Sequence, residues 1–264
     1  MNPIRMQFMR EKLLESAREH QDEDSCEASE TFAGLDILDI GCGGGLLCES
    51  LARLGANTLG IDASSSNVAI ATHHASADPS LNLSSHSPAH KSSRTSPGML
   101  SYAHTSAEDL LAAQGPKQFD VVCAMEVIEH VDNPRLFLND CAQLVKPGGH
   151  LFISTIARTP LAYFLTIFAA EQMLRLVSPG THTYSKYINP NELIDYFHQY
   201  KGPEREVPWI TRLVNGIPLR TEAETRGMVY LPWKGEWSLI PRHALGAKWA
   251  EGCNYLFWVR RPTE

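Results

Sequence analysis

The chain has 264 residues, of which 43% are hydrophobic, and a formal net charge of −7. This length allows one substantial core, so we expect a single domain over residues 1–264. The acidic balance argues against nucleic acid as a partner, because binding a phosphate backbone needs clustered lysine and arginine. No apolar run is long enough to span a bilayer, and the six cysteines form no Cys-x-x-Cys pair, which is typical of reduced thiols.

Helical and extended patterns alternate along the chain. Apolar spacing predicts a leading helix from Pro3 to Glu19, and an acidic linker follows it. Strands are predicted at 36–40, 58–62, 100–103, 119–124 and 150–154, and helices at 46–54, from 68, at 110–113 and at 134–145. This alternation favours an α/β fold with a doubly wound, mostly parallel sheet and helices on both faces.

Two segments depart from this alternation. Residues 76–97 are rich in serine, histidine and proline, so we expect a disordered surface insertion there. Residues 161–177 are nearly continuous in large apolar side chains but too short and too charged to cross a bilayer. They predict either a lid helix packed on the sheet or an interfacial helix at a membrane surface.

A glycine-rich loop closes the first predicted strand, where residues 38–45 read LDIGCGGG. Glycine takes positive φ freely and lets a ligand lie against the backbone, so the loop predicts a nucleotide-type cofactor. Leu46 stands where a dinucleotide fingerprint has its third glycine. Asp39 would repel a phosphate but suits the ammonium and sulfonium groups of S-adenosylmethionine (SAM). Asp62, at the end of the second strand, can accept both ribose hydroxyls.

The polar turn at residues 106–109, which reads SAED, follows the third predicted strand. Adenine would lie here, beside Ala107, if the cofactor follows the strand ends. Glu108 or Asp109 could accept its amino group, or the turn could simply cap the helix at 110–113.

Carboxylates and an imidazole come directly after the fourth strand, at Glu126, Glu129 and His130. Strand ends of open parallel sheets face the ligand crevice, so these side chains and Met125 should lie beside the cofactor. On a helical turn the three would share a face and could bind Mg²⁺ or Mn²⁺, with Zn²⁺ also possible. His130 could instead be a general base, or Glu129 and His130 could cap or orient the next helix.

Several motifs together resemble the ubiquinone-biosynthesis O-methyltransferase family. The glycine run and Lys-Pro-Gly-Gly at 146–149 are shared by many class I methyltransferases. More specific are Asn-Pro-x-Arg at 2–5, Met-Glu-x-x-Glu-His at 125–130 and Gly-Thr-His at 180–182.

The resemblance implies a seven-stranded Rossmann-like methyltransferase sheet and methylation of polyprenyl dihydroxybenzoate and demethylubiquinol, both catechol-like lipids. It implies a magnesium-type site at Glu126, Glu129 and His130. From their positions in the sequence, Glu126, His130 and His182, which follows the apolar segment, are the candidate catalytic residues. With the loop analysis, the expected cofactor-binding residues are Arg5, Asp39, Gly41, Gly43, Asp62, Ala107 and Met125.

The same resemblance implies peripheral association with the matrix side of the mitochondrial inner membrane and with other coenzyme Q biosynthesis proteins. The family usually has a Trp-Asp-containing helical segment before Asn-Pro-x-Arg, so we expect an N-terminally shortened chain. Residues 216–248 look like a eukaryotic elaboration beyond the compact bacterial pattern. A competing hypothesis is a catalytically silent methyltransferase-like subunit that binds prenyl-quinone intermediates.

Overall fold

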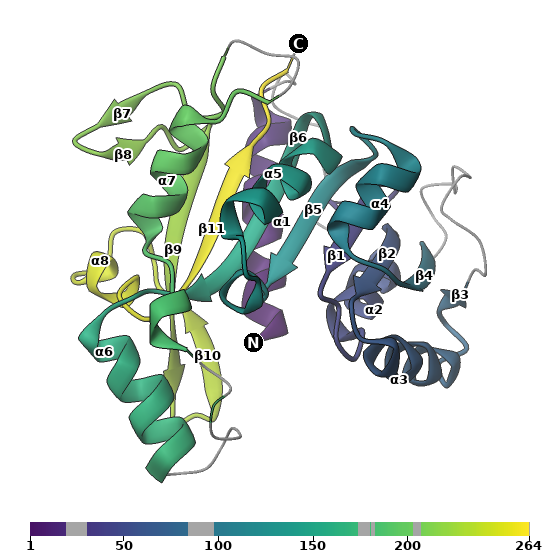
Figure 1. Ribbon diagram of the computed structural model, residues 1–264, viewed down its shortest axis with the longest axis horizontal. Coiled ribbons are helices and arrows are strands. Elements are labelled where there is room, and N and C mark those ends of the chain that lie inside the picture. Colours follow the sequence, from purple (N-terminus) through teal and green to yellow (C-terminus); the bar gives the residue numbers. More distant parts are fainter. Residues whose placement is uncertain (20–30, 84–97, 174–179, 181–182, 203–206, 264) are drawn as a thin grey trace.

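A twisted sheet with helices on both faces makes up the protein (Figure 1). The computed structural model describes residues 1–19, 31–83, 98–173, 180, 183–202 and 207–263. In that part of the chain the main sheet has nine strands, in the order β10-β9-β11-β6-β5-β1-β2-β4-β3. The strands are β1 (Asp36–Ile40), β2 (Asn57–Asp62), β3 (Asn82–Leu83), β4 (Met99–His104), β5 (Phe119–Met125), β6 (Val145–Ile156), β9 (Ala223–Leu231), β10 (Glu236–Leu239) and β11 (Asn254–Arg260), while β7 (Leu213–Val214) and β8 (Ile217–Pro218) form a separate hairpin.

The strand directions confirm the predicted doubly wound α/β fold. β3, β4, β2, β1, β5 and β6 pair in parallel, and β11 lies antiparallel to both β6 and β9. Seven strands from β9 to β4 form the continuous sheet that the resemblance implies, and short strands extend each edge. The strand order reverses at β1, because β2 and β4 lie on one side of it and β5 and β6 lie on the other. A switch point of this kind opens a ligand crevice at the carboxyl ends of the strands.

Helices cover the two faces in two groups. In β1, Ile37 faces one apolar cluster, which also holds Phe8 of α1, while Leu38 faces another, which holds Leu193 of α7. This alternation follows from the pleat of the strand, which sends successive side chains to opposite faces. The longer helices are α1 (Asn2–Arg18), α2 (Leu46–Arg53), α3 (Ser65–Ser76), α4 (Ala107–Gln114), α5 (Pro134–Leu144) and α7 (Pro190–Gln199), and the shorter ones are η2 (Ile128–His130), α6 (Pro160–Ala162), η3 (Tyr163–Met173), η4 (Tyr184–Lys186) and α8 (Ala247–Ala250).

Part of the expected insertion at 76–97 is ordered. Ser76 ends α3, and β3 (Asn82–Leu83) pairs with β4, while residues 84–97 lie outside the described residues. The apolar stretch at 161–177 is helical as far as Met173, where η3 ends, and η3 has the wide turns of a π-helix.

The C-terminal stretch at 216–248 contributes two strands, β9 and β10, to the main sheet. β9 lies between β10 and β11, as the outermost of the seven longer strands. Sequence patterning missed β9 because two of its buried side chains, Glu224 and Arg226, are charged and break the apolar run. The predicted turn at 146–149 lies within β6, where it interrupts the pairing register with β5. No helix among the described residues is long and apolar enough to cross a membrane.

Candidate active site

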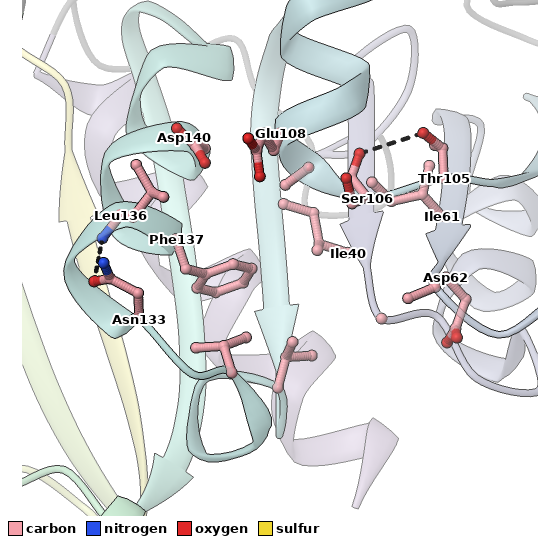
Figure 2. A pocket seen from close by; sticks show the side chains of 15 residues that line it. Ile40, Ile61, Asp62, Thr105, Ser106, Glu108, Asn133, Leu136, Phe137 and Asp140 are labelled. Carbon is pink, nitrogen blue, oxygen red and sulfur yellow. Dashed lines mark hydrogen bonds between the residues drawn. The ribbon is translucent and has the colours of Figure 1, made fainter.

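Two pockets open at the carboxyl ends of the central strands and share Gly41 as a wall. The first has a volume of about 290 Å³ and lies between β1, β2, α4 and α5 (Figure 2). The second, of about 180 Å³, lies under the N-terminal end of α1. An elongated ligand that passes Gly41 could therefore place one end in each pocket.

The glycine loop has the geometry that close approach of a ligand requires. Gly41 has φ +71°, and a Cβ atom built on it would overlap Cγ2 of Val127, so any side chain would clash. The backbone N–H groups of Gly41 and Cys42 donate to the Ile61 carbonyl at 2.8 and 3.0 Å. These bonds tie the loop to the end of β2, where Asp62 stands.

Asp62 is fixed by three donors, which come from the glycine loop, from the N-cap of α3 and from α3 itself. Its Oδ2 accepts from the Gly43 N–H at 3.0 Å, and Oδ1 accepts from the N–H of Ser64 at 2.8 Å and from Nδ2 of Asn67 at 3.2 Å. A carboxylate has about four acceptor positions, so one remains for a ribose hydroxyl. Asp62 lines the first pocket, where a ribose would need it.

The second pocket is polar and carries both signs of charge. Arg5, Asp39 and Met125 line it with Gly41, so four of the seven predicted cofactor residues meet at this place. Asp39 is buried, and burial raises the pKa of its carboxyl to about 6, although the Cys48 thiol donates to it at 3.1 Å and Arg5 lies nearby. Above that pH Asp39 is an anion that suits an ammonium group.

Glu108 and Asp109 of the 106–109 turn lie differently relative to the far end of the first pocket. Ala107 and Glu108 line the pocket. Asp109 does not line it, and its carboxylate and N–H both bond the Ser106 hydroxyl in the N-cap of α4. Glu108 thus remains the candidate for adenine, and Asp109 is a cap.

Asp140 of α5 is a pocket residue that the sequence analysis missed. It lines the first pocket opposite Glu108, and the two carboxylates face the same space in Figure 2. Burial and the charge of Glu108 raise the pKa of Asp140. The available signal was a carboxylate on the otherwise apolar face of α5 that holds Leu138, Cys141 and Leu144.

The structure does not gather Glu126, Glu129 and His130 on one helical face, so that prediction is wrong. The residues after β5 form only the short 3₁₀ helix η2 (Ile128–His130), and Glu126 lies outside it with φ +59°. Glu126 accepts from the Ser154 hydroxyl at 2.6 Å and lies 3.4 Å from the Arg5 guanidinium. Glu129 is buried and accepts from Thr155, whereas His130 is exposed.

As they lie, these three side chains do not fit a single metal ion. Among the described residues there is no group of three or more histidine, cysteine, aspartate or glutamate side chains that could hold one. Burial and the neighbouring charge of Glu126 raise the pKa of Glu129 well above its usual range. The third catalytic candidate, His182, lies outside the described residues.

Comparison with known proteins agrees with this geometry. A family model described as a methyltransferase domain matches residues 7–206. The plantazolicin methyltransferase BpumL, solved with S-adenosylhomocysteine (SAH), superposes with a TM-score of 0.54 at 13% identity, covering 97% of this chain and 84% of that one. A possible histamine N-methyltransferase from Thermotoga maritima gives 0.50 at 13% identity over 96% and 89% of the two chains. Fold, pockets and family model define the chain as a SAM-dependent methyltransferase.

Sequence relatives narrow this class. The mitochondrial ubiquinone biosynthesis O-methyltransferase of Schizosaccharomyces pombe is 40% identical over 99% of this chain and 77% of its own length. That of Sinorhizobium medicae is 37% identical over 99% of this chain and 85% of its own, and the chain spans 57% of the mitochondrial rat protein at 37% identity. The chain belongs to the ubiquinone biosynthesis O-methyltransferase family.

The raised pKa of Asp39 makes SAM binding depend on pH. Because the ammonium of SAM favours the ionised carboxylate, affinity should stay constant from pH 8 to 7 and fall about tenfold per pH unit below pH 6. Asp39→Asn should weaken binding by about tenfold or more at pH 7.5 and remove this pH dependence. Calorimetric titration from pH 5 to 8 measures both, with Asp109→Asn, a change outside the pocket, as the control that keeps the wild-type profile. Equal wild-type affinity at pH 5 and 7.5 would contradict this role.

Proposed function

We propose that the protein transfers the methyl group of SAM to a hydroxyl of a polyprenyl catechol in ubiquinone biosynthesis. The observation that carries the proposal is the positive φ of Glu126, which directly follows the pocket residue Met125 and is held by Arg5 and Ser154. A positive φ at a non-glycine residue is unfavourable and concentrates at functional sites. The relatives named as ubiquinone biosynthesis O-methyltransferases support the choice of acceptor.

The reaction is an in-line displacement, in which the acceptor oxygen forms a bond to the methyl carbon as the carbon–sulfur bond breaks. The acceptor hydroxyl must lose its proton to become a good nucleophile. Glu126 follows Met125 directly, and Met125 lines the pocket beside Arg5, so a carboxylate is available where the acceptor would approach. Arg5 and Ser154 hold that carboxylate in place, and we assign to it the orientation of the hydroxyl and the acceptance of its proton.

Transfer of a labelled methyl group to a short-tailed polyprenyl catechol tests this function. Glu126→Gln should lower kcat by roughly 10²-fold or more, because general-base catalysis contributes 10²–10⁴-fold, and should change SAM affinity little. Asp132→Asn, which removes an exposed carboxylate paired with Lys186, is the matched control and should retain wild-type activity. No transfer by a wild-type protein that binds SAM would contradict the proposal and support the catalytically silent subunit.

The magnesium ion predicted from the sequence stays a prediction, and no step of the proposed reaction passes through it. The same assay in excess chelator distinguishes the alternatives. Loss of transfer that added Mg²⁺ restores would support a metal site, whereas full activity with no metal retained would leave Glu126, His130 or His182 as the base.

We further propose that α6 and η3 lie on a membrane surface, peripherally. Large apolar side chains of this segment are exposed to solvent, and the helix projects from the sheet (Figure 1). They are Leu161, Tyr163, Phe164, Leu165 and Phe168, each between 39% and 53% exposed. The rings of Phe164 and Phe168 stack at 5.4 Å between centroids and form a contiguous apolar patch. A lipid tail on the acceptor would need such a surface near the site.

Sedimentation with anionic vesicles tests this surface. The double substitution Phe164→Ser and Phe168→Ser should reduce binding by tenfold or more, since burying each phenylalanine contributes about 1.5–3 kcal/mol. The matched control, Val214→Ser with Ile217→Ser, changes two exposed apolar residues on the β7–β8 hairpin and should sediment as wild type does. Equal loss in both variants, or none in either, would count against the assignment.

The site of action is proposed from the relatives. The eukaryotic ones are named as mitochondrial proteins, and we place this protein on the matrix side of the mitochondrial inner membrane, where it would act with other coenzyme Q biosynthesis proteins.

A further inference from the structure

A fully buried lysine lies in the middle of α1. Lys12 has no exposed surface, although lysine is almost never fully buried unless its charge is paired. Its position between helix and sheet is outside both pockets, so the reaction makes no direct use of its ammonium group. The contacts of its ammonium group therefore indicate what a buried Lys12 does.

The Lys12 ammonium group has three hydrogen-bond partners and an aromatic face. It donates to Oε2 of Glu15 at 2.8 Å, to Oε2 of Glu224 at 2.9 Å and to the carbonyl oxygen of Arg220 at 2.9 Å. It also lies 3.9 Å from the centroid of the Trp258 ring, within cation–π distance. Three donors and three acceptors fix the end of this side chain against β9 and β11.

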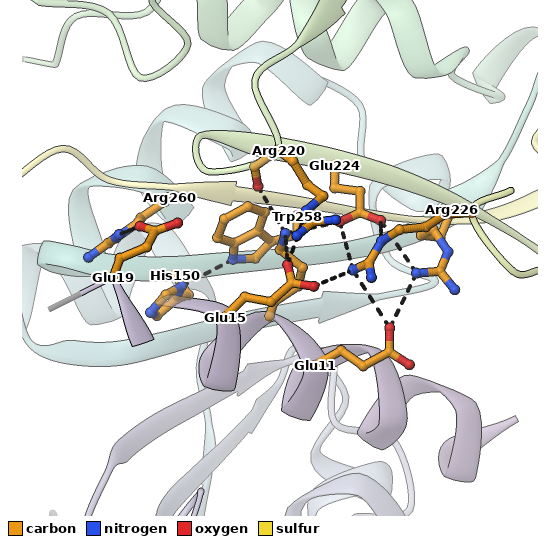
Figure 3. Close-up of polar contacts among 11 residues, drawn as sticks. Glu11, Glu15, Glu19, His150, Arg220, Glu224, Arg226, Trp258 and Arg260 are labelled. Atoms are coloured by element: carbon orange, nitrogen blue, oxygen red, sulfur yellow. Dashed lines mark hydrogen bonds and ion pairs between the residues drawn. The ribbon is translucent and has the colours of Figure 1, made fainter. Parts of the chain in front are cut away.

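Glu224, the main partner, is itself the centre of an ion-pair network. Arg242 donates to both its oxygens, at 2.6 and 3.1 Å, and Arg226 lies 3.4 Å away. Arg226 also pairs with Glu11 of α1 at 3.2 Å, so the network joins the helix to the sheet at a second place (Figure 3). Although burial raises the pKa of Glu224, the cations around it outweigh burial and lower it.

The face of α1 that carries Lys12 also carries Arg5. The two residues are seven positions apart, about two turns and 10 Å along the helix, and Phe8 lies between them. Phe8 packs edge-on against Phe152 of β6, with ring centroids 5.9 Å apart. Phe152 stands opposite Trp258 in the sheet, and Ser154, two residues on, accepts from Arg5 at 3.3 Å.

This face of α1 therefore contacts the sheet at three places, at Lys12, Phe8 and Arg5. A shift of α1 by one residue would rotate this face of the helix by about 100° and move Arg5 away from Glu126. The apolar contact of Phe8 is compatible with some sliding because it is not directional. The bonds of Lys12 are directional, so they define the position of the helix along and about its axis.

We propose that Lys12 is a positioning residue, which sets the placement of α1 through Glu224 and Trp258 and thereby holds the Arg5 guanidinium against Glu126 beside the cofactor. Because this role presupposes the proposed methyl transfer, the test uses SAM binding, which needs no acceptor, as well as turnover. A failure of transfer in the wild type then leaves the binding result interpretable.

A double-mutant cycle with Arg5 tests the proposal. Lys12→Arg keeps the charge and the approach to Glu224 and should fold; we expect it to raise the Kd and KM for SAM by about 5-fold, with Lys12→Met larger where it folds. In an Arg5→Ala background, Lys12→Arg should have almost no further effect on either constant, because its effect passes through Arg5.

The control is Glu19→Gln, which removes the ion pair with Arg260 at the other end of α1 and should leave both constants unchanged. A merely structural Lys12 would lower the unfolding temperature of both Lys12 variants without changing the Kd. An unchanged Kd in Lys12→Arg, or effects of Lys12 and Arg5 that multiply in the double variant, would overturn the proposal.

Discussion

The site depends on the turn at Gly41, where β1 ends. Two pockets meet at this residue because the chain turns in opposite directions on the two sides of β1. A side chain here would clash with Val127, so the loop after β1 and the loop after β5 constrain each other. Cofactor binding and placement of Glu126 are therefore consequences of a single turn.

Several ionisable side chains of the protein are buried, and each has a different kind of partner. Asp39 is a buried acid with a raised pKa. It lies in a pocket where a cation is expected, so the ammonium group of the ligand would balance its negative charge. Glu129 has a hydroxyl partner, and the carboxylate of Glu126 raises its pKa further. Lys12 and Glu224 compensate each other and form part of a network between helix and sheet. A buried pair adds little net stability but is strongly destabilising to break, which suits a positioning role.

Much of the fold could be predicted because local pattern and tertiary structure agree. The glycine loop, Asp62 and the strands of the parallel half carry apolar runs and turn residues at the right spacing, and Arg5, Asp39, Gly41 and Met125 do meet. β9 could not be found, since its buried Glu224 and Arg226 are paired with charged residues of α1 that lie far away in the sequence. Periodicity could not show that the turn after β5 is a short 3₁₀ helix, because Glu126 takes a left-handed conformation that the sequence does not signal.

The same limit applies to partners far apart in sequence. Nothing in the local sequence of α1 indicates partners for its glutamates, yet Glu11 and Glu15 bond arginines more than two hundred residues away. Likewise Asp140 enters the cofactor pocket from the helix opposite Glu108. Such pairings depend on which elements the sheet brings together, and that information is not local.

Hydrogen–deuterium exchange with and without saturating SAH tests the central claim most directly. If one cofactor spans both pockets past Gly41, it should slow exchange at the N-terminal turns of α1, residues 2–9, and at the start of α4, residues 105–110, in the same titration. Protection at 105–110 with no change in α1 would show that the second pocket is not part of the cofactor site, and would contradict the account.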